Sequence, residues 1–447
     1  MQKKTDQWSS KLGFILSSAG AAIGLGAIWK FPYMTGMNGG GAFFLLFIGF
    51  TIIIGLPLLI AEFIIGRGAQ KEAVSAYKAL APKSSWPIVG QLGVFGAFVL
   101  MSFYSVVGGW VLIYSAMSIP GLIIKDSANY EQLFATITGN PGITILGHAL
   151  FMIINIVVIS FGIKNGIEKA SKLLMPLLFV FFIILVIRSV TFDGAMEGLA
   201  FFLQPDFSKV TGESVLYALG QSFFSLAVGI SVMVTYSSYL KKDVSLPMSA
   251  GSVSIMNIFV SLLAGLAIFP IVFSFGLEPA EGPGLLFMVL PEAFAQMPFG
   301  ELFLSLFLLL FLFAVLTSSF SMLEIITSAF TVKKDRSRTK IAWIAGIIVF
   351  IAGIPAALSS SSLANFKLFG LTVFDASDFL VSNIILPVGC LLIAIFIGFR
   401  MDKTLVKQEF SNGHSLSNGT YQLWFQLIRW LVPITIIIVF LGSLGII

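Results

Sequence analysis

The chain has 447 residues, of which 57% are hydrophobic and only 11% are charged, and its formal net charge is +5. Soluble domains carry about 25% charged residues, so this composition excludes an ordinary soluble protein. A single cysteine excludes a disulfide framework, and two histidines are too few for the usual zinc cluster. The apolar residues come in runs of roughly 20 or more, which is the length that crosses about 30 Å of hydrocarbon. We therefore expect an all-α polytopic membrane protein.

The apolar runs predict eleven membrane-spanning helices. In chain order they cover residues 11–35, 39–66, 87–119, 143–162, 167–188, 213–240, 246–276, 299–330, 339–358, 376–399 and 421–446. The first run continues past Tyr33 without a cleavage-like site, so we interpret it as a span and not as a signal peptide. A further apolar stretch, residues 279–298, is broken by prolines and glutamates, and we expect a loop with short helices there. We treat residues 1–447 as a single transmembrane domain.

The basic residues predict how the chain is oriented. If the N-terminus is cytoplasmic, 21 of the 26 lysines and arginines fall on cytoplasmic segments, including the run KKDRSRTK at 333–340. This asymmetry is what the positive-inside rule describes. An odd number of spans then places Ile447 on the extracytoplasmic side. The positive net charge therefore reports membrane topology, and we expect no nucleic-acid partner.

Two of the predicted spans carry helix breakers near their middle. The first contains GAAIGLGAIWKFP, with Gly20, Gly24 and Gly26, and the sixth contains QSFFSLAVGISVMVTYSSY, with Ser225 and Gly229. Interrupted helices at matching positions of two halves indicate an inverted-repeat transporter. Interrupted backbone offers free N–H groups to an anion and free carbonyls to a cation. The alternative is that Gly20 and Gly24 form a small-xxx-small pattern for close helix packing.

Several motifs, in order along the chain, resemble the bacterial amino-acid branch of the neurotransmitter:sodium symporter family. They are GAAIGLGAIWKFP, NGGGAF (38–43), GQSFFSLAVG (220–229), GPGLLFMVLPEAF (282–294) and LTSSFSMLE (316–324). The resemblance runs from Trp8 to about Phe399. It implies the LeuT fold, with residues 11–188 and 213–399 as two inverted repeats of five helices and residues 421–446 as an eleventh helix.

The resemblance also implies a substrate site at the two interruptions. Amine-transporting members carry an aspartate where this chain has Gly24, so glycine leaves room for a substrate carboxylate. The N–H groups of Leu25 and Gly26 and the hydroxyl of Tyr104 would bind that carboxylate. The ammonium would meet the carbonyls of Ala22, Phe224 and Ser225. The side-chain pocket would be lined by Ala21, Leu100, Phe224, Ala227, Ile230, Ser318 and Met322. This lining is apolar apart from Ser318, and burying an unpaired polar group costs about 1–3 kcal/mol, so we expect an apolar amino acid.

Two sodium sites are implied by the same resemblance. Sodium site 2 would use the carbonyls of Gly20, Ile23 and Ala314 and the hydroxyls of Thr317 and Ser318. Hard cations prefer such oxygen ligands. Sodium site 1 departs from the family pattern because Ala27 stands where the family has an asparagine. Its remaining ligands would be Ala22, Ser225, Asn257 and the substrate carboxylate, so one site is expected and the second is open.

Chloride dependence is also open. The residues that match the chloride site of chloride-dependent relatives are Gln221, Ser225, Asn257 and Ser261, whereas Phe47 replaces the tyrosine of that site. Position 261 does not carry the carboxylate that many chloride-independent relatives place beside this site.

Residues that gate the site are implied on both sides. On the outer side, Lys30 would pair with Asp378, and Tyr104 and Phe224 would form an aromatic lid. On the inner side, Trp8 and Tyr239 match the family. The usual ion pair does not match, because Thr5 and the region of Val332 lack its charges. A substitute latch would join Lys3 or Lys4 to Glu324 or Asp335.

Three further positions are implied to support or bend the helices. Glu62 would hold the unwound backbone, and Gly166 and Pro176 match a glycine-x9-proline hinge in the fifth span.

These expectations predict a sodium-coupled symporter that imports an apolar α-amino acid by alternating access, in the cytoplasmic membrane of a bacterium. It would contact membrane lipid and need no obligate protein partner. A proton-coupled transporter and an amino-acid sensor that does not transport remain alternatives. A channel would need a continuous polar stripe, and a membrane enzyme would need a nucleophile–base pair near the serine cluster, so both are disfavoured.

Overall fold

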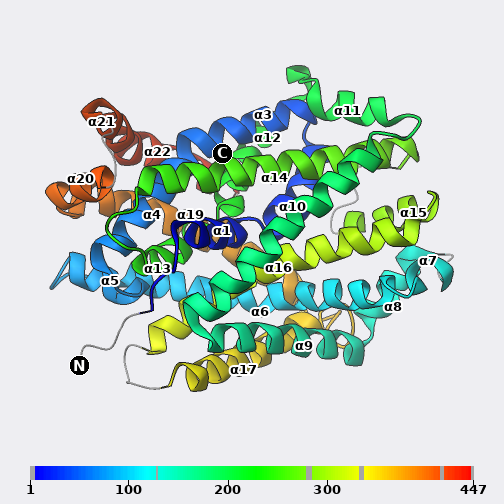
Figure 1. Cartoon of the computed structure of the whole chain (residues 1–447), viewed down its shortest axis with the longest axis horizontal. Helices are drawn as coiled ribbons and strands as arrows, with labels where there is room; N and C mark the ends of the chain where they lie inside the picture. Colours follow the sequence, from blue (N-terminus) through cyan, green and yellow to red (C-terminus); the bar gives the residue numbers. More distant parts are fainter. Residues whose placement is uncertain (1–5, 127–128, 278–283, 332–336, 413–416, 444–447) are drawn as a thin grey trace.

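The computed structural model describes residues 6–126, 129–277, 284–331, 337–412 and 417–443. Within these ranges the chain is built of helices, and the one β-bridge joins Leu368 to Leu371. Figure 1 shows the long helices lying side by side along the long axis of the molecule. Labels beginning with η mark short π- or 3-10-helical segments.

Nine helices among the described residues are long and apolar enough to cross a membrane. They are Gly41–Ala69 (α3, η2, α4), Pro87–Ser118 (α6), Pro141–Ser160 (α9), Ile163–Ser189 (η3, α10), Leu246–Ser274 (α14), Gly300–Thr331 (α16), Arg338–Ala357 (α17), Val373–Arg400 (α18, η6, α19, η7) and Asn418–Gly442 (α21, η8, α22). Their segments are α3 (Gly41–Phe50), η2 (Thr51–Gly55), α4 (Leu56–Ala69), η3 (Ile163–Glu168), α10 (Lys169–Ser189), α18 (Val373–Phe379), η6 (Leu380–Ile385), α19 (Leu386–Ile395), η7 (Phe396–Arg400), α21 (Asn418–Gln426), η8 (Leu427–Leu431) and α22 (Val432–Ser443).

The two segments that the sequence predicts to be interrupted are interrupted. The first consists of α1 (Lys11–Ala22) followed by η1 (Gly26–Lys30) and α2 (Phe31–Met37), and the two halves are bent by 53°. Counted as one span, this pair is the tenth. The other consists of α12 (Gly212–Ser225) and α13 (Val232–Ser238), separated by residues 226–231. The predicted sixth span, residues 213–240, corresponds to α12 and α13, so the nine or ten spans of the described residues agree approximately with the predicted eleven.

Short helices cover the ends of the long ones. They are α5 (Ala73–Leu80), α7 (Leu122–Asp126), α8 (Tyr130–Gly139), α11 (Ala195–Leu203), η4 (Phe207–Lys209), η5 (Leu285–Val289), α15 (Leu290–Ala295) and α20 (Lys403–Ser411). The stretch 279–298, predicted to be a loop with short helices, contains η5 and α15, while residues 278–283 lie outside the described residues.

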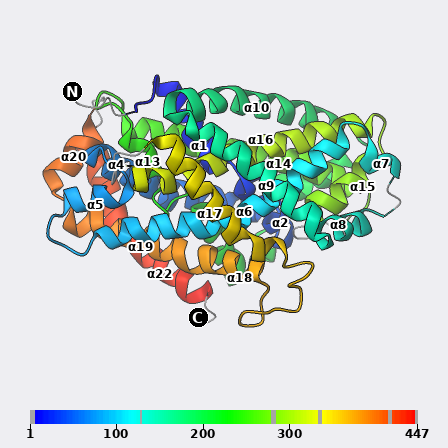
Figure 2. The same ribbon diagram turned by 90° about the horizontal axis from the view of Figure 1, so that it is seen from below.

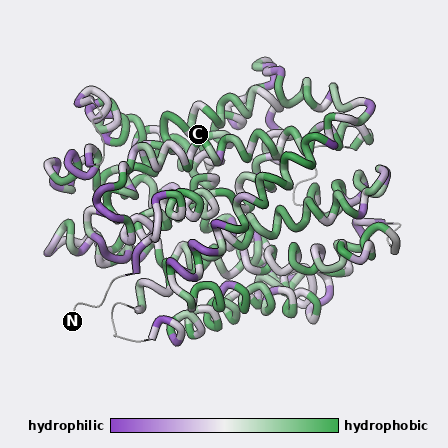
Figure 3. The backbone as a smooth tube through the Cα atoms, viewed as in Figure 1, coloured by the Kyte–Doolittle hydropathy of each residue, from purple (hydrophilic) through white to green (hydrophobic). Residues whose placement is uncertain are grey.

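Both broken segments lie inside the bundle. Helix α1 packs against α10, α14 and α16, and α13 packs against α4 and α16. Figure 3 shows hydrophobic residues along the lengths of the long helices and hydrophilic residues gathered toward their ends, including the end where the described chain begins. Backbone in lipid must satisfy its own hydrogen bonds, so interruptions are tolerated only where protein surrounds them. The packing places both interruptions in such surroundings.

Candidate functional site

Helix α1 ends at the first glycine-rich interruption. It begins at Ser10, whose hydroxyl accepts the Gly13 N–H at 3.0 Å as an N-cap. It ends because Ile23 leaves helical geometry, with φ −82° and ψ 85°. The Gly24 N–H then turns back to the Ala22 carbonyl at 3.1 Å, and the Leu25 N–H donates to the hydroxyl of Tyr104 at 3.3 Å. A side chain of α6 therefore takes the place of a helical carbonyl at this break.

The second interruption depends on left-handed backbone and on a buried acid. Ala227, Gly229 and Ser231 have positive φ values of 52°, 97° and 60°. Glu62 on α4 is fully buried, and its carboxylate accepts the N–H groups of Gly229 (2.7 Å), Met233 (3.1 Å) and Val234 (3.3 Å). Glu62 therefore satisfies the donors that start α13, as an N-terminal helix end requires.

The two interruptions enclose a small cavity with about 30 Å³ of free space. Every residue that the sequence analysis assigns to the substrate site lines it, apart from Ser225, which is buried beside it on α12. The lining is Ala21, Ala22, Gly24, Leu25, Gly26, Leu100, Tyr104, Phe224, Ala227, Ile230, Ser318, Met322 and, in addition, Leu386. These residues lie in five separate parts of the sequence, namely 21–26, 100–104, 224–230, 318–322 and position 386. The fold brings these distant parts to one place.

The cavity leaves no room for a side chain at its two glycines. A Cβ at Gly24 would lie 2.3 Å from the Ser318 hydroxyl oxygen and 2.6 Å from the Tyr104 hydroxyl oxygen. At Gly26 it would lie 3.0 Å from the Phe224 ring and 3.2 Å from the Ser225 Cα. The missing side chains therefore let Tyr104, Ser318 and Phe224 approach the interrupted backbone.

The residues assigned to sodium site 2 lie where α1 meets α16. Ser318 Oγ donates to the carbonyls of Gly20 (2.9 Å) and Ala21 (3.1 Å). Thr317 Oγ1 donates to the carbonyl of Ala314 at 3.0 Å, and a Cβ on Gly20 would lie 3.2 Å from that same hydroxyl. Ile23 follows α1, where carbonyls lack helical partners. The donor set is made of oxygens alone, which fits Na⁺.

The residues assigned to sodium site 1 and to chloride form a second polar group between α12, α14 and η1. Asn257 Nδ2 donates to the Ser225 hydroxyl at 3.0 Å, and Gln221 Nε2 donates to the Gly26 carbonyl at 2.6 Å. The side-chain oxygens of Asn257, Gln221 and Ser261 are buried and have no partner among the described residues. Ala27 is fully buried and offers only a methyl group. The unpartnered oxygens suit a cation, whereas both amides already donate to other oxygens.

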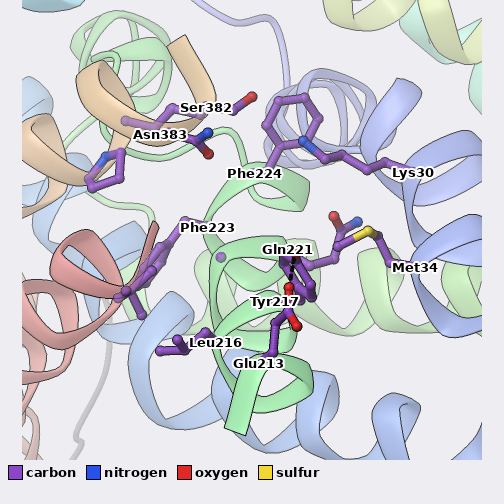
Figure 4. A pocket seen from close by; sticks show the side chains of 15 residues that line it. Lys30, Met34, Glu213, Leu216, Tyr217, Gln221, Phe223, Phe224, Ser382 and Asn383 are labelled. Atoms are coloured by element: carbon purple, nitrogen blue, oxygen red, sulfur yellow. Dashed lines mark hydrogen bonds between the residues drawn. The ribbon is translucent and has the colours of Figure 1, made fainter. Parts of the chain in front are cut away.

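A larger cavity of about 260 Å³ lies on the other side of Phe224 (Figure 4). Phe224 and Leu386 line both cavities, so these two side chains separate them. The Lys30 ammonium lies 4.6 Å from the centroid of the Phe224 ring, within cation–π range. Asp378 instead accepts a hydrogen bond from Ser382 at 2.9 Å. Lys30 and Asp378 both belong to the described chain and form no ion pair in it, so the predicted outer pair is not present in this structure.

The opposite end of α1 is closed by the segment that precedes it. Trp8 is buried, its indole N–H donates to the Tyr236 carbonyl at 2.8 Å, and its backbone N–H donates to the Tyr239 carbonyl at 3.3 Å. The Tyr239 hydroxyl donates to Glu324 at 2.8 Å. The fold therefore brings Trp8 and Tyr239, which the sequence analysis assigns to the inner side, into contact from opposite halves of the chain.

The ion pair at this end differs from the predicted latch. Glu324 is paired with Arg338, which also donates to the Ile159 carbonyl at 2.9 Å and lies 3.8 Å from Asp6. Lys3, Lys4 and Asp335 lie outside the described residues, as do Thr5 and Val332. Glu324 thus takes part as predicted, and its cation is Arg338 at the start of α17.

The hinge region of the fifth span contacts the start of α1. Gly166 lies in η3, and Pro176 lies inside α10. Between them, the buried carboxylate of Glu168 accepts the N–H (2.7 Å) and hydroxyl (2.5 Å) of Ser9 and pairs with Lys172 at 2.6 Å. The same carboxylate accepts the Ser10 hydroxyl at 3.2 Å. Gly13 is needed beside it, because a Cβ there would lie 1.9 Å from the Glu168 oxygen.

Four residues at the site escaped the sequence analysis: Leu386, Arg338, Asp6 and Glu168. Leu386 is one leucine in an apolar run, and nothing in the sequence distinguishes it. Of the three charged residues, only Arg338 has a signal in the sequence, because Glu324 is an acid within an apolar span and requires a cation. No comparable signal marks Asp6 or Glu168. The basic residues nearest to Glu324 in sequence are Lys333, Lys334, Arg336 and Arg338, and the sequence does not distinguish among them.

Comparison with known proteins gives concordant matches. A sequence model described as "Sodium:neurotransmitter symporter family" matches residues 5–132 and 129–446. An uncharacterised sodium-dependent transporter of Bacillus subtilis, YhdH, is 51% identical over 446 residues, which cover 100% of this chain and 99% of that protein. An uncharacterised sodium-dependent transporter of Haemophilus influenzae is 39% identical, with 99% of each chain covered.

A solved structure agrees with these relatives. The crystal structure of MhsT in complex with L-phenylalanine matches with a TM-score of 0.91 and 41% identity, covering 98% of this chain and 100% of that one. MhsT has the LeuT fold, so the predicted fold is confirmed. The chain therefore belongs to the sodium:neurotransmitter symporter family, as a multi-pass, sodium-dependent membrane transporter.

Proposed function

We propose that this protein is a symporter that carries an apolar α-amino acid together with Na⁺, and that the small cavity between the two interruptions is its substrate site. The observation that supports this most is the composition of that cavity, which combines interrupted backbone, the hydroxyls of Tyr104 and Ser318 and an otherwise apolar lining. In this proposal residues 11–188 and 213–399 are the two inverted repeats, with residues 421–446 as an added helix.

The carboxylate of the substrate would lie against the backbone at Gly24. The N–H groups at the start of η1 lie at the positive end of a helix, which favours an anion. The Tyr104 hydroxyl now accepts the Leu25 N–H and would donate its own hydrogen to the carboxylate. The absence of any carboxylate side chain at position 24 is consistent with a substrate that brings its own acid.

The substrate side chain would occupy the part of the cavity lined by Leu100, Ile230, Met322 and Leu386. This lining offers no charge, so it favours an aliphatic or aromatic group. MhsT, at 41% identity, binds L-phenylalanine in its crystal structure. We extend that substrate class to this chain. Because the cavity has only about 30 Å³ of free space, the surrounding helices must move apart to admit a substrate.

Sodium would be co-transported at site 2, through the oxygens of Gly20, Ile23, Ala314, Thr317 and Ser318. At site 1 the unpartnered oxygen of Asn257 and the hydroxyl of Ser225 would contact a second Na⁺ despite the methyl group at Ala27. Because ligands can drive a conformational cycle only by binding its states unequally, Na⁺ must favour the state in which α1 contacts α16.

Transport would alternate between the two ends of the bundle. On the predicted extracytoplasmic side, Phe224 with Lys30 covers the cavity, and Asp378 would be recruited when that side closes fully. On the predicted cytoplasmic side, Trp8, Tyr239 and Glu324 would separate, and the Gly166–Pro176 hinge would let water reach site 2.

The test is uptake of radiolabelled L-phenylalanine into proteoliposomes, with and without an inward sodium gradient, in competition with each of the common amino acids. We expect sodium-driven uptake that leucine, isoleucine, methionine or tryptophan inhibits and that aspartate and lysine do not. Uptake driven equally by a proton gradient without sodium would favour the proton-coupled alternative. Sodium-dependent binding without accumulation would favour a sensor.

A further inference from the structure

The loop between α17 and α18 contains a hairpin whose apolar side chains are exposed. This hairpin, residues 366–371 (FKLFGL), joins two membrane-spanning helices. Phe369 at its tip is fully exposed, at 105%, and Phe366 is 52% exposed. Leu368 and Leu371 are exposed by 39% and 37%. Figure 2 shows the loop as a gold trace that reaches outward beside α18, away from the helix bundle.

Two backbone hydrogen bonds close the hairpin. The Leu368 N–H donates to the Leu371 carbonyl at 2.8 Å, and the Leu371 N–H donates to the Leu368 carbonyl at 3.0 Å. The two central residues, Phe369 and Gly370, have φ values of 52° and 85°. This is a two-residue hairpin turn of the type that strongly prefers asparagine or aspartate followed by glycine. A fully exposed phenylalanine in a left-handed conformation is unfavourable in water, so its presence calls for a compensating contact.

Lipid at the membrane interface matches this hairpin in three respects. Its flanking helices α17 and α18 both belong to membrane-spanning segments, so the loop leaves and re-enters the membrane on one face. The paired backbone groups of Leu368 and Leu371 lower the cost of moving the tip out of water, because unsatisfied backbone is what lipid excludes. Aromatic residues are enriched at this depth, and Lys367, between Phe366 and Leu368, can extend its ammonium toward headgroups.

We propose that the 366–371 hairpin inserts into the membrane–water interface beside the bundle, on the predicted extracytoplasmic side, and anchors the start of α18 to the bilayer. The base of the loop is fixed, because the Phe374 N–H donates to the Ser359 hydroxyl at 3.1 Å. The anchored helix continues into η6, which supplies Ser382 and Asn383 to the larger cavity, and then into α19, which supplies Leu386. The hairpin therefore ties one wall of that cavity to the lipid surface. This inference is independent of which substrate the protein carries.

The experiment measures the depth of the hairpin by spin labelling of the full chain in liposomes of phosphatidylethanolamine and phosphatidylglycerol. Cys390 is buried and is the single cysteine, so Cys390→Ala gives a background without reactive thiols. Nitroxide labels are placed at Phe369→Cys and, as a water-exposed control, at Lys209→Cys, whose side chain is 63% exposed and charged. Collision rates with dissolved oxygen, which enriches in lipid, and with a water-soluble nickel chelate are compared.

We expect the label at position 369 to collide with the nickel chelate at least threefold less often than the label at 209, and with oxygen more often. Equal nickel accessibility at the two positions would overturn the proposal. Dipolar broadening between 369 labels that disappears on dilution with unlabelled protein would overturn it too, because it would place a second copy of the chain on the hairpin.

A second variant keeps the test independent of the label at the tip. Phe369→Asn suits the left-handed turn, so the chain should fold at least as well, as thermal unfolding in detergent can verify. With the label moved to Phe366→Cys, we expect Phe369→Asn to raise nickel accessibility at least twofold. An unchanged accessibility at 366 would show that Phe369 anchors nothing.

Discussion

The two ends of the proposed transport path are closed by different kinds of contact. At the end next to α1 a network of hydrogen bonds and charges joins Trp8, Tyr239, Glu324 and Arg338. At the other end two apolar side chains, Phe224 and Leu386, separate the small cavity from one of about 260 Å³, and the Lys30 ammonium lies over the Phe224 ring. The end beside Trp8 is therefore held by many polar contacts, whereas the end beside Phe224 is closed by apolar side chains. In the proposed transport cycle these are the inner and the outer closure, and the apolar one would give way to a substrate.

This difference teaches how such a transporter can hold one end closed while it opens the other. Buried charges destabilise a protein strongly when one partner is removed, so a polar network tends to be either fully formed or broken. A cation–π contact at a partly exposed site contributes only about 0.5–1 kcal/mol. The outer contact therefore exchanges more readily than the inner one.

Of the variants considered, Arg338→Ala is expected to weaken the closure beside Trp8 the most. The variant leaves the buried Glu324 without a cation, and breaking a buried pair costs about 3–5 kcal/mol. We expect the inner closure to loosen, so that a cysteine placed at the buried Ser17 of α1 reacts with a small membrane-permeant maleimide at least tenfold faster.

The matched control removes both charges at once. Arg338→Gln combined with Glu324→Gln leaves no unpaired ion, so it should accelerate the labelling much less than Arg338→Ala. Equal acceleration in both variants would contradict a role for the charge pair.

The second-largest effect is expected on the KM for uptake, from a change in the small cavity between the two closures. Tyr104→Phe removes the hydroxyl that contacts the Leu25 N–H and leaves that donor unpaired, at a cost of about 1–3 kcal/mol. We expect the KM for amino-acid uptake to rise about 10-fold or more. Tyr114→Phe is the control, because that hydroxyl is buried on the same helix and does not line the cavity. A similar rise in both variants would indicate a packing effect.

A smaller effect is expected at the contact between the fifth span and α1. Glu168→Gln retains an acceptor for the Ser9 N–H and loses the charge that pairs with Lys172. Hydrogen bonds to a charged group are worth about 1.5–3 kcal/mol, so a partial loss of about 1 kcal/mol is expected. The maleimide reaction at position 17 should accelerate about fivefold, and Lys172→Met, a half-exposed partner, should change it less than twofold. No change with Glu168→Gln would remove this carboxylate from the inner closure.

The smallest effect is expected at the outer closure. Lys30→Met keeps the apolar stem and removes the ammonium from the Phe224 ring, so the KM should change by about two- to fivefold. Asp378→Asn probes the pair that this structure does not contain. Substrate binding in the conformation described should be unaffected by Asp378→Asn, while the transport rate falls if the pair forms later in the cycle. A reduced binding affinity in Asp378→Asn would contradict this order of events.

The same contrast explains what the sequence could predict. Both interruptions are marked by local chemistry, namely Gly24 in the first span and Gly229 in the sixth, whereas the lining contributed by Leu100, Tyr104, Ser318 and Met322 is implied by the family resemblance. The inner network could not be predicted in the same way. Arg338 and Glu324 are separated by a loop, and Arg338 lies in a basic run that predicts membrane orientation. Glu168 lies between lysines and was hidden for the same reason. Long-range pairs of charges depend on how the helices pack, which residue types alone do not determine.

The central proposal is that substrate binds in the small cavity at Gly24. Sodium-dependent binding of radiolabelled L-phenylalanine to the purified protein tests this with Gly24→Ala, which would add a Cβ 2.3 Å from Ser318 Oγ and 2.6 Å from the Tyr104 hydroxyl. The control is Gly251→Ala on α14, where an added Cβ meets nothing within 4 Å. We predict binding to the parent protein and to Gly251→Ala, and at least a 30-fold loss of affinity in folded Gly24→Ala. Unchanged binding to Gly24→Ala would contradict the account.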